Sequence, residues 1–185
     1  RKLLFRDGAR EDETCDWLRA NLRVAAIKDC EPHHVNYLRS RTIHAMKKFL
    51  NSASIHEYGC KLLACLFHQA SDDESFAQDR FIAELEIMHH SLKRHIKNPT
   101  NTIAACSALR NFNILLSVSM TDNVPGLNDA LSRTLAEVTK ALVVYGDDVE
   151  TLERVTGALW ALCGVRKSLA LSFTTDLLIV TAMNR

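Results

Sequence analysis

The chain has 185 residues and a mass of 20.8 kDa, which is enough for one or two domains with a sizeable buried core. It holds only 6 Gly and 3 Pro, well below their usual share, and its 23 basic and 22 acidic residues leave a net charge of +1. The shortage of turn-forming residues excludes a disordered chain, a collagen-like chain and a many-turned β-sandwich. The balanced charge gives no indication of a nucleic acid or an anionic membrane as partner.

Apolar residues recur at helical spacing along almost the whole chain and predict about eight helices and no strand. Ser54 with Glu57 three residues later predicts a capping box at the start of one helix. Pro99 cannot continue the helix before it, and Asp147 and Asp148 predict the N-cap of another helix. The breaks between helices fall at residues 30–33, 51–54, 69–74, 97–101, 121–126, 146–148, 164–167 and 173–175.

One helical pattern occurs in three segments of the chain. Residues 59–66 align with residues 105–112 at an offset of 46, and these align with residues 155–162 at an offset of 50. The preceding helix keeps the same register, since Met46, Leu92 and Leu142 align at the same offsets. A helical period of this length is typical of armadillo and HEAT repeats.

Each copy places a small residue and several apolar residues on one helix face. The small residues are Gly59, Ala105 and Gly157, and we expect neighbouring helices to approach closely there. No copy can bury its apolar face alone, so the copies must stack. We therefore expect a single domain over residues 1–185, and a chain that is a fragment of a longer protein. Its units are predicted at 1–32 (partial), 33–72, 73–121, 122–166 and 167–185 (truncated).

Two segments resemble the third helix of armadillo repeats: Gly-Ala-Leu-Trp-Ala-Leu at 157–162 and Ala-Leu-Arg-Asn-Phe at 108–112. Residues 55–60 resemble the start of that helix, and the resemblance covers roughly residues 10–185. It implies an all-α, armadillo-like right-handed α-solenoid, in which the third helices line a concave groove. It also implies a protein-interaction scaffold, whereas the periodicity alone indicates only stacked helices.

Importin-alpha-type repeats carry a Trp and, four residues later, an Asn on the third helix. Here the Asn position holds Cys65, Asn111 and Ala161, and the Trp position holds Lys61, Ser107 and Gly157. Only Asn111 matches, which argues against a nuclear-transport adaptor. A HEAT-like nucleic-acid enzyme needs a basic, aromatic-lined face, and a net charge of +1 with 6% aromatic residues argues against that class too.

Two clusters of polar residues invite other interpretations. Cys65 lies about 140° around a helix from Cys60, so His56, Cys60, Cys65 and His68 do not converge as a zinc site requires, and we predict no metal and no cofactor. The second cluster is a basic stretch near a helix end, which we interpret as a solvated face that complements the helix dipole, with anion binding as the alternative. It comprises His89, His90, Lys93, Arg94, His95 and Lys97.

The cysteines and the apolar runs bear on localisation. No apolar run exceeds six residues, far below the roughly 20 of a membrane-spanning helix, so we expect no membrane insertion. Scattered cysteines in a chain with a real core are typical of free thiols in a reducing compartment, either the cytoplasm or the nucleus. They are Cys15, Cys30, Cys60, Cys65, Cys106 and Cys163.

No catalytic motif, glycine-rich phosphate loop or small-molecule site is recognisable, so we expect a non-catalytic protein that binds a folded or helical partner protein. The alternative is a regulatory segment that contacts neighbouring domains of its own chain. Trp160 takes the position of Ala64 and Arg110 in the other copies, and it is either an exposed binding anchor or buried against the next unit. The groove is predicted to present Lys61, His68, Ser107, Arg110, Asn111, Glu153 and Trp160.

Overall fold

The computed structural model describes residues 8–27, 30–69, 78–119 and 125–165, and within these ranges it contains helices and turns but no strand. The predicted all-α class is therefore confirmed for this part of the chain. The helices expected beyond residue 165 lie outside the described residues. The seven helices described are α1 (Glu11–Ile27), α2 (Pro32–Lys48), α3 (Ala53–Gln69), α4 (Gln78–His95), α5 (Pro99–Ser119), α6 (Leu127–Val144) and α7 (Val149–Val165).

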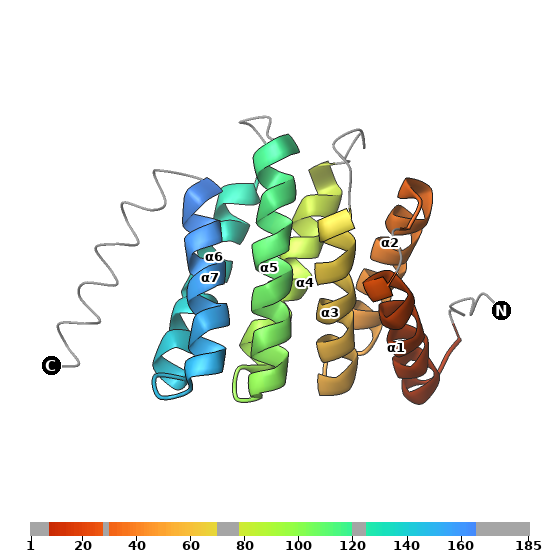
Figure 1. Cartoon of the computed structure of the whole chain (residues 1–185), viewed down its shortest axis with the longest axis horizontal. Helices are drawn as coiled ribbons and strands as arrows, with labels where there is room; N and C mark the ends of the chain where they lie inside the picture. The colour runs from red at the N-terminus through yellow and green to blue at the C-terminus, as the bar shows by residue number, and fades with distance from the viewer. Residues whose placement is uncertain (1–7, 28–29, 70–77, 120–124, 166–185) are drawn as a thin grey trace, which may run out of the picture.

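The helices form two layers (Figure 1). Helices α1, α3, α5 and α7 pack side by side in chain order, and we call them the front layer; α2, α4 and α6 lie behind them and form the back layer. Each back helix also packs against the front helix that follows it in the chain. The result is a row of three helical hairpins, and the helix that resembles a third armadillo helix is the second helix of each hairpin.

The starts of the front helices follow the spacing of the sequence pattern. Helices α3, α5 and α7 begin at residues 53, 99 and 149, so their starts are 46 and 50 residues apart. Neighbouring front helices therefore present equivalent sequence positions at equivalent levels.

The predicted helix caps are partly right. Asp148 accepts hydrogen bonds from the backbone N–H of Thr151 (3.4 Å) and from its hydroxyl (2.7 Å), which confirms the N-cap of α7. The predicted capping box at Ser54 is wrong. The side-chain oxygen of Ser52 accepts the N–H of Ile55 (3.3 Å), and α3 begins at Ala53, before the predicted N-cap residue. Glu57 instead forms an ion pair with Lys61 one turn further along α3.

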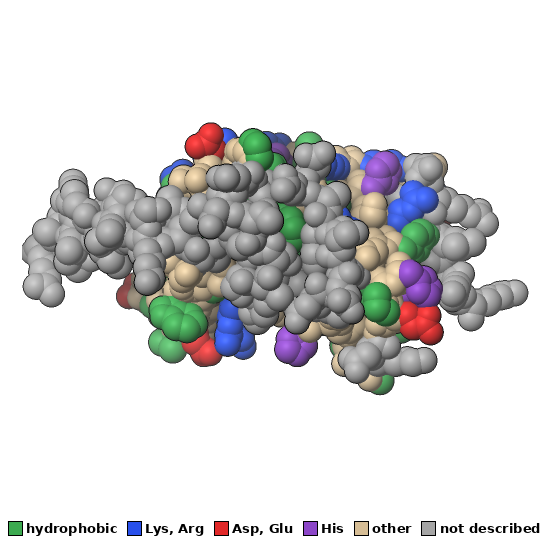
Figure 2. Space-filling model, turned by 90° about the horizontal axis from the view of Figure 1, so that it is seen from above, with side chains coloured by type: hydrophobic (Ala, Val, Ile, Leu, Met, Phe, Trp, Pro, Cys, Tyr) green, Lys and Arg blue, Asp and Glu red, His purple; other side chains and the backbone are tan. Residues whose placement is uncertain are grey.

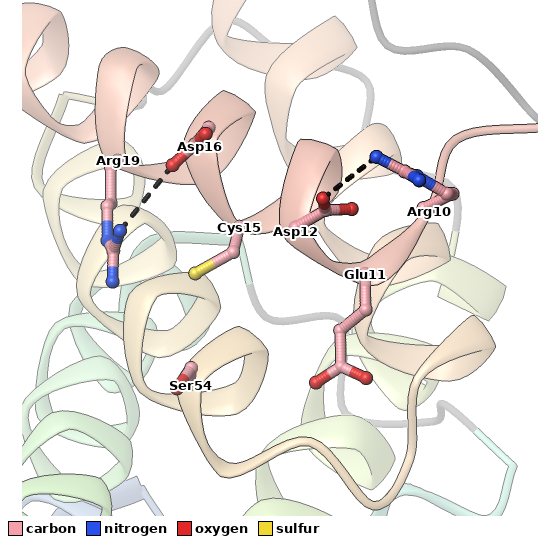
Figure 3. Close-up of a pocket in the computed structure, with 7 residues that line it drawn as sticks. All are labelled: Arg10, Glu11, Asp12, Cys15, Asp16, Arg19 and Ser54. Atoms are coloured by element: carbon pink, nitrogen blue, oxygen red, sulfur yellow. Dashed lines mark hydrogen bonds and ion pairs between the residues drawn. The ribbon is translucent and has the colours of Figure 1, made fainter.

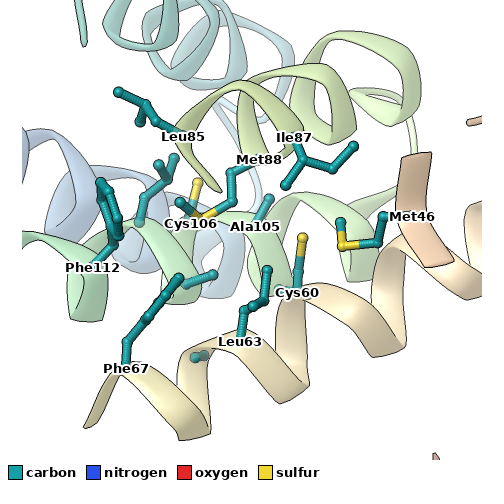
Figure 4. Close-up of a cluster of buried hydrophobic side chains, with 14 of the residues drawn as sticks. Met46, Cys60, Leu63, Phe67, Leu85, Ile87, Met88, Ala105, Cys106 and Phe112 are labelled. Carbon is teal, nitrogen blue, oxygen red and sulfur yellow. The ribbon is translucent and has the colours of Figure 1, made fainter. Parts of the chain in front are cut away.

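The hydrophobic core lies between the two layers (Figure 4). The rings of Phe67 in α3 and Phe112 in α5 lie 5.2 Å apart, and Phe81 of α4 packs edge-on against Phe112 at 5.8 Å. These three rings join two front helices to the back layer.

The small residues of the repeated pattern have different surroundings. A Cβ atom at Gly59 would lie 2.6 Å from the sulfur of Met46, so α2 and α3 meet closely there, and Ala105 is fully buried. The expectation of a close helix approach at Gly157 is wrong. The nearest atom to a Cβ there is Cδ of the Arg110 side chain at 3.9 Å, because an arginine stem rather than a helix backbone fills the space.

Two predictions from the sequence concern the cysteines and the lengths of the apolar helices. All six cysteines are free thiols, as predicted. Burial raises the pKa of Cys60 and of Cys106 to about 12, so both remain protonated. Among the described helices, none is long and apolar enough to cross a bilayer.

Candidate functional site

The seven residues predicted for the groove lie on the front helices α3, α5 and α7. Figure 2 looks down on the molecule from above, so the front layer runs along its lower edge, where apolar, basic, acidic and histidine side chains all appear. Four of the seven are exposed, namely His68, Arg110, Glu153 and Trp160; the other three are half-buried, namely Lys61, Ser107 and Asn111.

Trp160 is the largest exposed apolar side chain of this surface. It is 84% exposed among the described residues, which favours the first of its two interpretations, an exposed binding anchor. The equivalent position on α5 holds exposed Arg110, and that on α3 holds Ala64, which is nearly buried. Trp160 therefore adds apolar surface at a position where the preceding helices present a cation or a methyl group.

Arg110 lies close to the helix that carries Trp160. Its Cδ atom is 3.9 Å from the place of a Cβ at Gly157, one turn before Trp160 on α7. A methyl group at residue 157 would be in ordinary van der Waals contact with this arginine stem. Arg110 forms no ion pair with any described residue, and its guanidinium is free to meet an acceptor on a partner.

The half-buried members of the set bond within the molecule. The Asn111 side-chain nitrogen donates to the carbonyl of Ala64 (2.8 Å), which ties α5 to α3. The Ser107 hydroxyl donates to Ile103 (2.8 Å), and Lys61 forms an ion pair with Glu57 (2.5 Å). Ser107 consequently retains only acceptor capacity for an outside ligand, whereas Asn111 retains its side-chain oxygen and one N–H.

The sequence does not reveal a histidine cluster at the junction of the two layers, and the expected solvated face is wrong for His89, His90 and His95, which are half-buried. The ring of His56, in α3, is 5.0 Å from the ring of His95 and 6.0 Å from that of His90, both in α4. His56 is fully buried and neither ring nitrogen makes a hydrogen bond with the described residues. Burial, followed by the neighbouring His95 and His90, lowers the pKa of His56 to about 4.

These histidines and the cysteines do not form a metal site in the described part of the chain. His56 and Cys60 are buried, Cys65 is half-buried and His68 is exposed, so the four do not converge. Among the described residues, no three His, Cys, Asp or Glu side chains are grouped as a metal ion would require.

A surface depression of about 570 Å³ lies between the starts of α1 and α3 (Figure 3). Ion pairs occupy its rim, since Arg10 bonds Asp12 (3.0 Å) and Arg19 bonds Asp16 (3.5 Å). Burial raises the pKa of the Cys15 thiol at its base, so this thiol is not activated as a nucleophile. Its lining residues are Arg10, Glu11, Asp12, Cys15, Asp16, Arg19 and Ser54.

No family model matches the chain, and comparisons with curated proteins and with solved structures find no match either. The resemblance to armadillo repeats therefore depends on the quoted sequence segments alone.

Proposed function

We propose that the protein is a non-catalytic scaffold that binds another protein through the outer surface of α3, α5 and α7. The observation that carries the proposal is Trp160, 84% exposed among the described residues, with Arg110, which forms no ion pair with any of them, on the neighbouring helix. Trp, Tyr and Arg are the residue types most enriched among binding hot spots.

The proposal includes an armadillo-like right-handed α-solenoid as the architecture. Three observations support it: the matched offsets in the sequence, the row of hairpins, and the front helices that begin at equivalent positions. In such a solenoid the front layer supplies a continuous binding surface. The proposed location of the protein is the cytoplasm or the nucleus.

The chemistry of this surface favours a folded or helical partner. Trp160 offers a flat apolar contact, Arg110 offers donors for a carboxylate or a carbonyl group, and Glu153 adds a negative charge on α7. The residue types change from helix to helix, whereas an extended repetitive peptide would be matched by one repeated residue type.

The test compares partner binding by the parent chain with that of Trp160→Ala and Arg110→Glu. Truncating an anchor of this kind commonly costs about 2 kcal/mol or more, which is roughly thirtyfold in affinity. A photo-crosslinker at residue 160 identifies the partner, and titration of the purified partner then gives the dissociation constants. Both variants are expected to weaken binding while circular dichroism shows an unchanged fold.

The matched control is Arg154→Glu, which reverses an exposed cation on α7 outside the predicted set and should bind normally. Full retention of affinity by both Trp160→Ala and Arg110→Glu would refute the proposed surface. Crosslinking to a neighbouring domain of a longer form of the same chain would support the alternative, a regulatory segment that binds its own protein.

A further inference from the structure

Three turns and the start of α1 share one end of the molecule, the lower end in Figure 1. Two hydrogen bonds connect them across the hairpins. The Lys48 ammonium donates to the carbonyl of Ala9 before α1 (2.7 Å), and the Tyr145 hydroxyl donates to the carbonyl of Ile96 after α4 (2.8 Å). Side chains at the ends of α2, α4 and α6 therefore belong to one surface.

Exposed cations gather in the middle of this surface. Lys47 lies at the end of α2, Lys93 and Arg94 lie at the end of α4, and Lys97 follows in the turn; we call these four residues the basic end. Their positions correspond between helices, because buried Met46 and Leu92 align at the 46-residue offset and precede Lys47 and Lys93.

The basic end lacks counter-ions in the described part of the chain. None of its four members forms an ion pair with a described residue. Most other cations of the described ranges do so, namely Arg10, Arg19, Arg39, Lys61, Arg80, Arg133 and Lys140. The unbalanced positive charge is therefore local, although the whole chain is almost neutral.

Compensation of helix dipoles does not account for these cations. A basic residue in the last turn does stabilise a helix C-terminus. However, α6, which ends at the same end of the molecule, has none in its last turn, so the fold does not require cations at this position. The positive charge at the ends of α2 and α4 is therefore available to bind an anionic ligand.

Carboxylates on both sides limit the length of that ligand. Glu11, Asp12 and Glu13 stand at the start of α1 on one side, and Asp147 and Asp148 stand in the α6–α7 turn on the other. A long polyanion such as nucleic acid, laid along the row of hairpins, would meet repulsion at both flanks. We infer that the basic end is a second interaction surface, which binds a short acidic segment of a partner protein.

An NMR titration of the isotope-labelled chain with a polyglutamate peptide of about six residues tests this inference. Such a peptide reaches about 20 Å, enough to span two helix ends about 10 Å apart. The expected result is saturable shifts confined to the amides near residues 47 and 93–97, which weaken about tenfold when the salt concentration rises from about 0.05 M to about 0.5 M. A polyglutamine peptide should cause no saturable shift.

Two matched double variants separate this surface from net charge. Lys93→Glu/Arg94→Glu should weaken peptide binding about tenfold, because each exposed charge pair contributes a factor of about two to five. Arg23→Glu/Arg154→Glu makes the same change in net charge at exposed cations elsewhere and should stay within about twofold of the parent. Trp160→Ala should bind the peptide normally, so the result is independent of the front-layer proposal.

Three outcomes would overturn the inference. They are the absence of saturable shifts, equal losses in the two double variants, and tighter binding of a single-stranded oligonucleotide of the same charge. The last outcome would assign the basic end to nucleic acid.

Discussion

The back layer and the front layer are held together by different chemistry. In the back layer, Arg39 of α2 and Glu84 of α4 are both fully buried and form two parallel bonds, Nε to Oε1 at 2.9 Å and Nη2 to Oε2 at 2.7 Å. In the front layer, α3 and α5 meet mainly through apolar side chains such as Phe67 and Phe112, with one hydrogen bond from the side chain of Asn111 to the carbonyl of Ala64. A buried bidentate pair permits one register of two helices, whereas apolar packing tolerates small shifts.

Polar contacts continue along the back layer in both directions from Glu84. Arg80 donates to the side chain of Asn36 (2.6 Å) and to its carbonyl (2.7 Å), and so adds a second link between α4 and α2. Arg133 of α6 forms an ion pair with Glu86 of α4. Polar side chains therefore link all three helices of the back layer, from α2 through α4 to α6.

Glu84→Ala should produce the largest loss of stability, because it removes the carboxylate that forms two hydrogen bonds with the buried Arg39 guanidinium. Breaking one member of a buried pair costs about 3–5 kcal/mol in the free energy of unfolding, and urea denaturation measures it. Arg39→Met/Glu84→Leu removes both charges and should recover most of this loss. A double variant as unstable as Glu84→Ala would show that size and shape, rather than charge, matter at this site.

The junction between the layers should make stability depend on pH through His56. Its pKa is about 4 in the fold against 6.5 in a free histidine, so the unfolded chain binds a proton first as the pH falls. Stability is therefore complete above about pH 6.5 and decreases towards pH 4, by up to about 3 kcal/mol. Burial lowers the pKa values of His89, His90 and His95 as well, and these act in the same direction.

Denaturation at about pH 7 and about pH 5 measures this dependence, and the expected difference is about 2 kcal/mol for His56 alone. His56→Leu removes the titrating ring and should flatten the profile by that amount. An unchanged profile in this variant would assign the pH dependence to other groups.

The difference between the layers also determines what the sequence could predict. Helix positions followed from apolar periodicity, which is a local property, and the 46- and 50-residue offsets gave the spacing of the front helices. The Arg39–Glu84 pair could not be predicted, since its members are 45 residues apart and each looks like an ordinary charge on a helical pattern. The start of α3 was misplaced because Ser52 and Ser54 are both acceptable N-cap residues.

The sequence could predict which helix face carries the candidate site, but not which side chains of that face bond within the molecule. Helical periodicity selected the residues of the front surface. It could not show that Asn111 bonds to Ala64, because that contact needs the neighbouring helix. The exposure of Trp160 and the place of Arg110 over Gly157 depend on packing between α5 and α7 in the same way.

Gly59→Ala should destabilise the fold, because α3 meets the back helix α2 at this residue. The new Cβ would lie 2.6 Å from the sulfur and 2.7 Å from Cγ of Met46, so that side chain must move within the core. Overpacking of this kind typically costs about 1–3 kcal/mol, less a helix-propensity gain of up to about 1 kcal/mol. Thermal unfolding measures the net loss, and Met46→Ala/Gly59→Ala should remove the overpacking term.

Gly157→Ala is the same substitution on another front helix, α7, two positions further along the repeated pattern, and it should have the smallest effect and the opposite sign. Among the described residues, a Cβ here meets only Cδ of Arg110, at an ordinary contact distance of 3.9 Å, and Gly157 has no positive φ. Replacing a helical glycine without strain stabilises a protein by about 0.4–1 kcal/mol, so the unfolding temperature should rise slightly. If Gly157→Ala lowers the unfolding temperature as much as Gly59→Ala does, α7 must pack closely against another element at this face, and the surface beside Trp160 is not open.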